Sequence, residues 1–394
     1  MNRIHLGCIA DDFTGATDLA NNLVRAGMRV VQTIGVPETA LDIDADAIVV
    51  ALKSRTISTF DSTPAGNIGP VIDALMAALG TPFTIATPAF PDNHRTVFKG
   101  YLFVGEELLN ESGMRNHPLT PMTDANLVRV LQAQTRQRVG LIDHRTVAQG
   151  EAAIRSRMAD LQAAGIHIAI VDAVSSDDLL RLGPALRGLP LVTGGSGVAI
   201  GLPANFGLAP SLRAAALPPA GGLQAIVSGS CSTATNAQVA DFVASGGPAF
   251  VLDPIRIAAG EDMVVEALAW ARPRLAVGPV LVYSTARPDA VQAIQSRLGV
   301  EDAGAMVERT IARIACGLVQ EGVRQLVVAG GETSGACVQA LRISRFLIGP
   351  QIDPGVPWCH AASPLTPEGL HLTLKSGNFG TPDFFRKALR VLSA

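Results

Sequence analysis

Residues 4–35 read IHLGCIADDFTGATDLANNLVRAGMRVVQTIG and decide the fold class. The run Ile4–Ala10 predicts a buried strand, Thr17–Ala26 predicts a helix that ends at Gly27, and Arg29–Gly35 predicts a second strand. Strand, helix and strand in this order form a βαβ unit, in which the strands are parallel and the crossover is right-handed. The opening of the chain therefore indicates an α/β fold.

The same alternation continues along the chain. Further strands are expected at Ala47–Leu52, Phe83–Thr87, Val139–Asp143, His167–Asp172 and Pro190–Thr193, and then at Leu223–Val227, Ala249–Leu252, Val280–Tyr283 and Gln325–Ala329. Helices are expected at Glu151–Ala164 and, after the capping pair Ser175 and Ser176, at Asp177–Leu182. The segment Leu217–Gly222, LPPAGG, is the best linker. We expect two α/β domains with mainly parallel sheets and a ligand cleft between them.

Composition narrows the class of protein. The chain has 394 residues, enough for two or three domains, and 48% hydrophobic residues, which excludes a disordered chain. A net charge of −3 offers no general attraction to nucleic acid or to a membrane surface. The five cysteines form no CxxC pair, and no stretch reaches the roughly 18 apolar residues of a membrane span. We expect a soluble cytoplasmic protein with small-molecule partners, and the sequence leaves a homo-oligomer open.

The loop ADDFTGATD carries the strongest local signal. It lies where a strand ends and a helix begins, which is where open parallel sheets bind ligands. Thr14 and Gly15 place backbone N–H groups at a helix N-terminus that suits an anion, and Asp11 and Asp12 could bind sugar hydroxyls or accept a proton. A single aspartate in this position most often only caps the helix, but the pair beside Thr-Gly favours a functional role.

Cationic side chains follow other strands. Lys53 and Arg55 end the strand AIVVAL, and the whole chain has only four lysines, so this placement suggests recognition of a carboxylate or phosphate; a solvated strand end is equally compatible. His94 and Arg95, in the loop TPAFPDNHRT, could meet an anionic ligand, although a surface histidine is the commoner outcome. His144 could act as an acid or base, but a lone histidine at a strand end is more often structural.

Three glycine-rich turns follow strands: TGGSG at 193–197, VSGSCST at 227–233 and AGGETSG at 329–335. Glycines let the backbone approach a phosphate, while hydroxyls and helix N-termini supply donors. None matches GxxxxGK[ST] or GxGxxG, so the P-loop and dinucleotide families are unsupported. With the loop KSGNFG at 375–380, the two later turns indicate a nucleoside triphosphate site. Mg²⁺ would arrive with the nucleotide, with Glu332 as its suggested neighbour and its ligands unknown.

The chain resembles the four-carbon acid sugar kinase family over essentially its whole length, and most closely the 3-oxo-tetronate kinases of that family. The stretches that carry the resemblance are IADDFTGATDLA, SGSCSTATNAQ, VVAGGETSGA, IGPQIDPGVPW, LKSGNFG and PDFF. The resemblance implies a substrate-binding domain for an acid sugar at 1–216, a linker at 217–222 and a nucleotide-binding domain at 223–394. It also implies ATP-dependent phosphorylation of the terminal hydroxyl of 3-oxo-tetronate.

The resemblance also assigns residues. ATP-binding motifs fall on Ser228, Gly330, Gly331, Glu332, Thr333 and Gly377, and Ser230 lies in the first of these turns. Segments that face the acid sugar contain Asp11, Asp12, Arg55 and Arg95. We assign the catalytic base to Asp12, because it lies nearer the helix N-terminus while Asp11 anchors hydroxyls, although the helix dipole there lowers the basicity of a carboxylate. Substrate binding is assigned to Asp11, Thr14, Gly15, Lys53, Arg55 and Arg95.

One departure from the family concerns residues 56–63, where Thr56-Ile57 runs directly into STFDST. The family usually has roughly thirty more residues at this point, about the length of a helix and a strand. We expect a segment to be missing between Ile57 and Ser58, which a wide break in the backbone would support and a normal peptide bond would contradict. A true deletion would remove a strand and a ligand lysine, and with them the expectation of activity.

Three other functions stay open. A kinase for threonate or erythronate would share every motif quoted above. A non-catalytic sugar-acid-binding protein would keep the acid site, but it would not need the glycine turns of the second half. A dehydrogenase that uses NAD is weaker still, because the dinucleotide fingerprint is missing.

Overall fold

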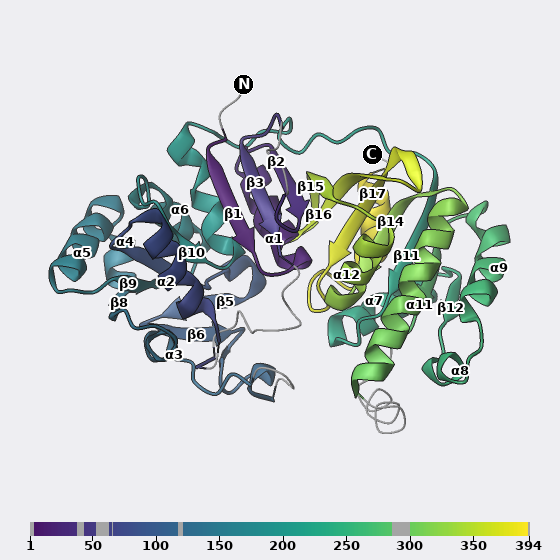
Figure 1. Ribbon diagram of the computed structural model, residues 1–394, viewed down its shortest axis with the longest axis horizontal. Coiled ribbons are helices and arrows are strands. Elements are labelled where there is room, and N and C mark those ends of the chain that lie inside the picture. The colour runs from purple at the N-terminus through teal and green to yellow at the C-terminus, as the bar shows by residue number, and fades with distance from the viewer. Residues whose placement is uncertain are drawn as a thin grey trace. The chain divides into compact units, whose positions relative to one another are not determined.

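The computed structural model describes residues 4–37, 43–52, 63–64, 66–116, 121–285 and 300–392, the side chains of 300–303 excepted (Figure 1). Helices and strands alternate along most of the chain, as the α/β prediction requires. Within these ranges, no helix is both long enough and apolar enough to cross a membrane.

The chain divides into two compact units. The first contains Met1–Val24, Arg29–Lys53 and Leu212–Ala394, and the second contains Arg25–Met28 and Ser54–Ser211, counting only described residues. These units differ from the expected domains 1–216 and 223–394, because the first strands of the chain belong to the same sheet as the strands of the C-terminal half. The α/β class, the two-part organisation and the mainly parallel sheets are confirmed.

The first unit is built on a ten-stranded sheet with the order β1-β3-β2-β15-β16-β17-β14-β11-β13-β12. Its strands are β1 (Leu6–Ala10), β2 (Val30–Ile34), β3 (Ala47–Ala51), β11 (Leu223–Ser228), β12 (Ala249–Val251), β13 (Val280–Tyr283), β14 (Val323–Ala329), β15 (Arg345–Asp353), β16 (Val356–Ser363) and β17 (Thr366–Lys375). The groups β1-β3-β2 and β17-β14-β11-β13-β12 are each parallel, and β15 and β16 join them by antiparallel pairing.

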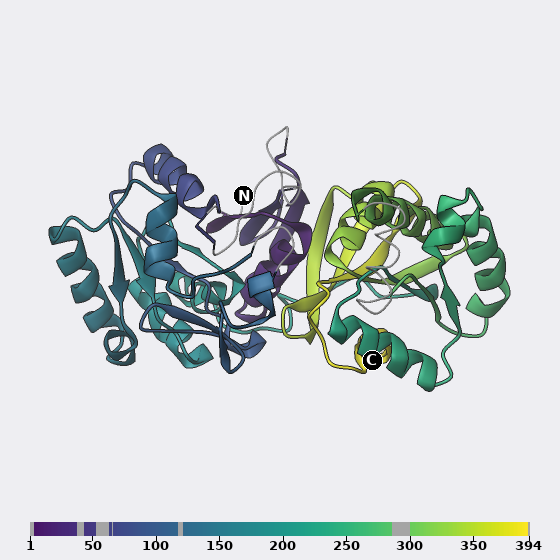
Figure 2. The same cartoon turned by 90° about the horizontal axis from the view of Figure 1, so that it is seen from below.

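Helices cover both faces of the parallel group β14-β11-β13-β12, as Figure 2 shows. The helices of this unit are α1 (Phe13–Arg25), α7 (Thr233–Ala244), α8 (Pro254–Ala258), α9 (Met263–Leu275), α11 (Val300–Gln320), α12 (Gly331–Ala340) and α13 (Phe384–Val391). On one face, α7 and α13 bury Phe242, Phe384 and Phe385 against the sheet. The fully buried indole of Trp358 donates to the carbonyl of Ala388 at 2.9 Å, which ties α13 to this core.

The second unit has a four-stranded parallel sheet, β10-β4-β9-β8, and a small antiparallel sheet, β5-β6-β7. Its strands are β4 (Thr84–Thr87), β5 (Arg95–Phe98), β6 (Tyr101–Val104), β7 (Glu107–Leu108), β8 (Val139–Ile142), β9 (Ile168–Val171) and β10 (Thr193–Gly194). Its helices are α2 (Ile68–Leu79), α3 (Leu127–Gln134), α4 (His144–Ala148), α5 (Glu151–Ala163) and α6 (Ser176–Ala185), with 3₁₀ turns η1 (Pro91–Asn93), η2 (Gly113–Asn116), η3 (Ser196–Gly201) and η4 (Pro203–Phe206).

Two hydrophobic clusters fill the second unit, one on each side of the parallel sheet. One contains Ile72, Leu131 and Ile170, and the other contains Phe83 and Ile142. Alternate residues of β9 contribute to the two clusters, as expected for a strand that is buried on both faces.

Two expectations about elements need correction. Helix α1 begins at Phe13 rather than at Thr17, because the Asp12 carboxylate caps it and draws the Thr-Gly pair into the first turn. The antiparallel strands β15 to β17 were not predicted as strands, because prolines and glycines interrupt their alternation of polar and apolar residues.

Candidate functional site

Three glycine-rich turns meet at one edge of the first unit's sheet. They follow β11, β14 and β17, which are neighbouring parallel strands, and the carboxyl edge of such a group is where α/β proteins bind ligands. The N–H of Gly229 donates to the carbonyl of Ala329 at 3.0 Å, and the N–H of Gly330 donates to the carbonyl of Lys375 at 2.8 Å. The turns therefore form one connected unit, which we call the turn cluster: residues 228–233, 329–335 and 375–380.

Packing within the turn cluster leaves little space for side chains on its glycines. A β-carbon on Gly330 would lie 2.8 Å from Oγ1 of Thr333 and 3.2 Å from the backbone nitrogen of Ser230. One on Gly377 would lie 2.6 Å from Oγ of Ser230. The structure thus brings together Ser230, Gly330, Thr333 and Gly377, all of which the sequence analysis assigned to ATP.

Ser228 occupies a different position in the cluster. Its side chain is fully buried, and its Oγ lies 2.7 Å from Oγ1 of Thr285, with which it shares a hydrogen bond. Its assignment to ATP stays a prediction, and the observed contact shows that its hydroxyl also fastens the turn after β11 to the segment after β13.

Two helices begin in the turn cluster. Helix α7 is capped by Ser232, whose side chain accepts from the N–H of Thr235. Helix α12 begins at Gly331 after Gly330, which has a φ of 126° and offers no side chain to cap the first turn. The N–H groups at the start of α12 therefore meet the requirements of an anion-binding helix terminus.

Two carboxylates lie beside the start of α12. Glu332 is in its first turn, and Glu308 of α11 is close enough for the Glu332 charge to act on it. Burial is the main cause that raises the pKa of Glu308 above its usual value, and the negative charge of Glu332 adds to the rise. No group of three or more His, Cys, Asp or Glu residues is placed to share a metal ion in the described part of the chain.

The acidic loop lies at the start of α1. Oδ1 of Asp12 accepts from the N–H of Gly15 at 2.6 Å and from the hydroxyl of Thr14 at 3.0 Å. The Gly15 N–H, which the sequence analysis offered to an anion, is thus engaged by the cap. Asp11 is also close, because a β-carbon on Gly15 would lie 3.7 Å from its Oδ1 and 3.2 Å from Oδ1 of Asp12.

Helix α1 brings this loop next to the turn cluster. The ring of Phe13 lies 3.6 Å from where a β-carbon on Gly335 would be, so the first turn of α1 packs against α12. One turn further on, the Asp18 carboxylate and the Phe379 ring both lie against Gly355. The predicted substrate aspartates and the predicted ATP turns therefore belong to one packed unit.

Of the predicted cationic residues, only Arg95 is among the described residues. Lys53, Arg55 and the junction between Ile57 and Ser58 lie outside the described residues. Arg95 begins β5 in the second unit, where its backbone N–H donates to the carbonyl of Phe90 at 3.1 Å. Its role in binding the substrate stays a prediction.

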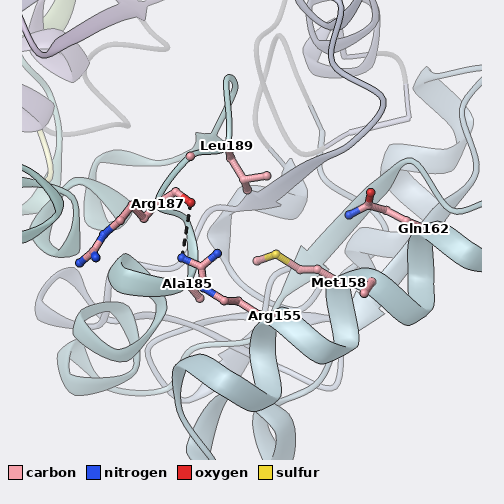
Figure 3. A pocket seen from close by; sticks show the side chains of 8 residues that line it. Arg155, Met158, Gln162, Ala185, Arg187 and Leu189 are labelled. Carbon is pink, nitrogen blue, oxygen red and sulfur yellow. Dashed lines mark hydrogen bonds between the residues drawn. The ribbon is translucent and has the colours of Figure 1, made fainter.

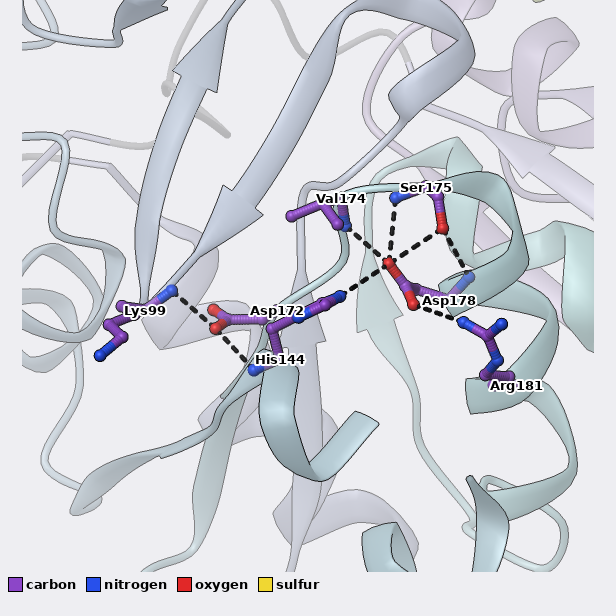
Figure 4. Close-up of polar contacts among 7 residues, drawn as sticks. All are labelled: Lys99, His144, Asp172, Val174, Ser175, Asp178 and Arg181. Carbon is purple, nitrogen blue, oxygen red and sulfur yellow. Dashed lines mark hydrogen bonds and ion pairs between the residues drawn. The ribbon is translucent and has the colours of Figure 1, made fainter. Parts of the chain in front are cut away.

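A polar network follows β8 and β9 in the second unit (Figure 4). The buried Asp172 carboxylate accepts from the N–H groups of Lys99 at 2.6 Å, Gly100 at 2.8 Å and His144 at 2.9 Å. Burial raises the pKa of Asp172, and these three hydrogen bonds oppose the rise. Nε2 of His144 lies 3.4 Å from Oδ2 of the buried Asp178, so the histidine ring is held in a fixed position at the carboxyl edge of this sheet.

A surface hollow of the second unit lies away from these residues (Figure 3). It has a volume of about 250 Å³ and lies between α5 and the end of α6. Arg155 on its wall donates to the carbonyl of Pro184 at 2.8 Å and to Oε1 of Glu151 at 3.0 Å. Its charge is thus committed to neighbouring groups, and none of the predicted site residues lines the hollow.

The sequence analysis missed three residues that hold the turn cluster together: Ser232, Thr235 and Thr285. The pattern Ser232-Thr-Ala-Thr235 signals a helix N-cap, and could have placed the first two at the start of α7. Thr285 follows β13 in a segment without glycine, and only the sheet order brings it next to Ser228.

Comparison with family models divides the chain in two. A sugar-binding N-terminal domain matches residues 6–59 and 56–202, and a nucleotide-binding C-terminal domain matches residues 225–385. The turn cluster falls in the second match, and Asp11 and Asp12 fall in the first. The break in the first match coincides with the departure noted at Ile57 and Ser58.

Curated relatives match over nearly the full chain. A 3-oxo-tetronate kinase of Burkholderia multivorans is 58% identical, covering 98% of this chain and 97% of the relative. One from Pseudomonas fluorescens is 54% identical with the same coverage, and one from Haemophilus influenzae is 43% identical over 97% of this chain and 98% of the relative. The first alignment runs over 420 positions, more than the 394 residues of this chain, so that relative has residues that are absent here.

Solved structures show the same fold. A crystal structure of a Salmonella typhimurium protein has a TM-score of 0.86 at 41% identity and covers 98% of this chain and 99% of its own. One of a Haemophilus influenzae protein has a TM-score of 0.77 at 42% identity, with 98% of this chain and 100% of its own covered.

Proposed function

This chain belongs to the four-carbon acid sugar kinase family, and on that basis we propose that it transfers the γ-phosphoryl group of ATP to the terminal hydroxyl of 3-oxo-tetronate. The products are 3-oxo-tetronate 4-phosphate and ADP. The observation that carries the proposal is the turn cluster, in which three donor-rich turns meet at one sheet edge next to the start of an uncapped helix.

The turn cluster supplies what a triphosphate needs. We infer that the glycines at 330, 331 and 377 allow the backbone to approach phosphate oxygens, and that the start of α12 directs N–H groups and the positive end of a helix dipole toward them. Ser230 and Thr333 add hydroxyl groups at the same edge. In phosphoryl transfer such groups position the phosphates and stabilise the charge that develops on them.

Mg²⁺ is part of the proposal, because a bound ion would neutralise charge on the phosphates, as it does in kinases. The residues present fit such an ion. Glu332 lies in the first turn of α12, and its negative charge adds to the rise that burial causes in the pKa of Glu308. Glu332 would hold the ion together with the phosphates, as Mg²⁺ sites with one or two carboxylates do.

The chemistry also needs a group that accepts the proton of the attacking hydroxyl, and we assign that role to Asp12. Asp11 and Thr14 belong to the same turn and are proposed to orient the substrate hydroxyls, whereas the N–H of Gly15 is engaged by the Asp12 cap. Lys53, Arg55 and Arg95 are proposed to bind the carboxylate of the acid, since guanidinium and ammonium groups match that charge. The five cysteines are free, and we propose a cytoplasmic location for the reaction.

The test compares three acids with the purified full chain. Release of ADP is measured with 3-oxo-tetronate, threonate and erythronate at equal concentrations. We expect the highest kcat/KM with 3-oxo-tetronate, and a preference for either other acid would reassign the substrate within the family. A second measurement, thermal stabilisation by a non-hydrolysable ATP analogue, separates a kinase from an acid-binding protein, which would show none.

A further inference from the structure

Lys375 ends β17 with a side chain that is fully buried. Nζ donates to Oγ1 of Thr235 at 2.9 Å and to three backbone carbonyls of the loop that follows: those of Ser376 at 3.0 Å, Gly377 at 3.0 Å and Phe379 at 3.2 Å. It makes no ion pair with a carboxylate in the described part of the chain. A buried charge without a counterion is costly, so this ammonium calls for a functional explanation.

The hydrogen bonds of Lys375 determine where the N–H groups of the loop point. In a trans peptide unit the C=O and N–H point in opposite directions, and the described chain has no cis peptide bond. Carbonyls that face the ammonium therefore direct the N–H groups of Gly377, Asn378 and Gly380 away from it. None of these three N–H groups has a hydrogen-bond partner within the described ranges, whereas that of Phe379 closes the turn on the Ser376 carbonyl at 3.1 Å.

The start of α7 fixes the loop from the same side as the ammonium. The carbonyl of Gly377 accepts from Oγ1 of Thr235 at 2.9 Å, from Ser232 Oγ at 2.5 Å and from Lys375. The same Thr235 hydroxyl accepts from Lys375, so the ammonium, the hydroxyl and the carbonyl form a closed network. Removing the ammonium would leave two further carbonyls of the loop without this donor.

We propose that Lys375 is a positioning residue for the nucleotide: its buried ammonium gathers the carbonyls of residues 376–379, so that the N–H groups of the loop face the phosphates of ATP. The inference rests on the proposed function, since it requires that the turn cluster binds a nucleotide. Lys375 acts through the loop. The positive charge of its ammonium stays uncompensated until an anion binds on the face of the loop that carries the N–H groups.

This arrangement makes nucleotide binding sensitive to pH. The titratable groups around the loop are Cys231 in the first turn, Glu332 on α12, Asp18 of α1 beside the Phe379 ring, and, at the far end, Asp383 and Asp353 with its partner Lys387. None of them contacts the Lys375 ammonium, and burial lowers the pKa of Lys375 to about 7. Above this pH the Lys375 side chain is a neutral amine. It has two N–H donors instead of three and no charge to attract the carbonyls of the loop. Phosphate bound on the far side raises that pKa again, so binding takes up a proton when the pH exceeds about 7.

The experiment is titration calorimetry of the full chain with an imido analogue of ATP between pH 6 and pH 9. We expect the affinity of the wild type to fall by up to about tenfold per pH unit above pH 7, which is the limit for one linked proton. Lys375→Met should bind on the order of a hundredfold more weakly at pH 6, as expected for loss of charge-assisted bonds, and should lack this extra pH dependence. The ionisation of the analogue itself is common to both proteins.

Lys99→Met is the matched control, because Lys99 is an exposed lysine of the second unit. It should keep both the affinity and the pH profile of the wild type. Proton uptake at pH 8, measured in buffers of different ionisation enthalpy, tests the wild type without any variant, so a misfolded Lys375→Met does not leave the inference undecided.

Two results would overturn the inference: wild-type binding at pH 8 without proton uptake, or a folded Lys375→Met that binds with the wild-type affinity and profile. A wild type that fails to bind the analogue at any pH would overturn the proposed function and this inference with it. Kinase activity with weak pH dependence of binding would contradict only the role of Lys375.

Discussion

The hydroxyl of Thr333 fills the space that a β-carbon on Gly229 would need. Gly229 follows β11 and Thr333 lies in the first turn of α12, so this contact joins two neighbouring turns of the cluster without a gap. The backbone of Gly229 also donates to Ala329 at 3.0 Å, which prevents the turn from moving away. This edge of the sheet is therefore assembled by contacts that tolerate almost no added volume.

Gly229→Ala should damage the turn cluster while leaving the fold intact. The new methyl group would meet Thr333 and would also approach Cδ1 of Ile311 at 3.1 Å, an overpacking that typically costs about 1–3 kcal/mol. We expect weaker binding of the ATP analogue and a lower Tm. Gly229→Ala/Thr333→Ala should recover part of both losses, and Gly278→Ala, where the methyl group meets nothing within 4 Å, should behave as the wild type. Equal losses in the single and double variants would contradict this account.

Asp12→Asn tests the proposed base. Asparagine is as good an N-cap as aspartate, so the bond to Gly15 is kept while the ability to accept a proton is lost. We expect kcat to fall by about a hundredfold or more, the usual contribution of a general base, with ATP affinity nearly unchanged. Asp11→Asn should mainly raise KM for the acid. If Asp12→Asn raises KM and leaves kcat near normal, Asp12 binds the substrate and another group is the base.

The paired histidines of β16 and β17 should make stability depend on pH. His360 and His371 are opposite each other, with ring centroids 4.9 Å apart. Burial lowers the pKa of both, and the charge of His371 lowers that of His360 further. Because the folded pKa lies below the unfolded value of about 6.5, the unfolded state binds more protons as the pH falls. The free energy of unfolding should thus decrease below about pH 6.5, by at most about 1.4 kcal/mol per pH unit for each histidine.

Urea unfolding at pH 5, 6 and 7 measures this slope. His360→Gln should reduce it, because one of the two linked groups is removed. His94→Asn is the control: His94 is exposed with a φ of 56°, a conformation that asparagine tolerates, and its removal should leave the slope unchanged. If the free energy of unfolding of His360→Gln depends on pH as steeply as that of the wild type, groups other than this histidine cause the pH dependence.

Asp172→Asn should destabilise the second unit. The amide would present an NH₂ group to N–H donors that now bind a carboxylate, and a buried donor without an acceptor costs about 1–3 kcal/mol. We expect a Tm lower by several degrees, in line with about 2–4 °C per kcal/mol for a unit of this size. Asp177→Asn, an exposed aspartate of α6, should change Tm far less. A Tm equal to the wild type for Asp172→Asn would show that the three N–H groups find other acceptors.

The sequence allowed much of the fold to be predicted, because its local signals are strong. The strands around β8 and β9 were placed within a residue or two, and the helix starting after Ser175 does have a capping box. The glycines also singled out the turns that form the turn cluster, and the assignment of these turns to ATP stays a prediction. Local patterns of this kind depend on residues close together in the chain, which is what sequence reading detects best.

What could not be predicted depends on long-range pairing. Nothing near Thr33 indicates that β2 will pair with Arg345 in β15, since pairing across the chain leaves no local pattern. The same applies to the bond between Ser228 and Thr285, and to the burial of Lys375 under its own loop. The N-cap at Asp12 was foreseen as one alternative, but the competition between capping and a substrate role needs the observed geometry.

The pairing of β2 with β15 also has a consequence for synthesis of the chain. Roughly 300 residues separate the two strands, and at about 5–20 residues per second the ribosome needs tens of seconds to supply the second one. During that time β2 has a bare edge of backbone donors and acceptors, the kind of edge that attracts other strands. We therefore expect the nascent N-terminal segment to depend on chaperones, because the strands that emerge first can be enclosed only when the C-terminal hairpin arrives.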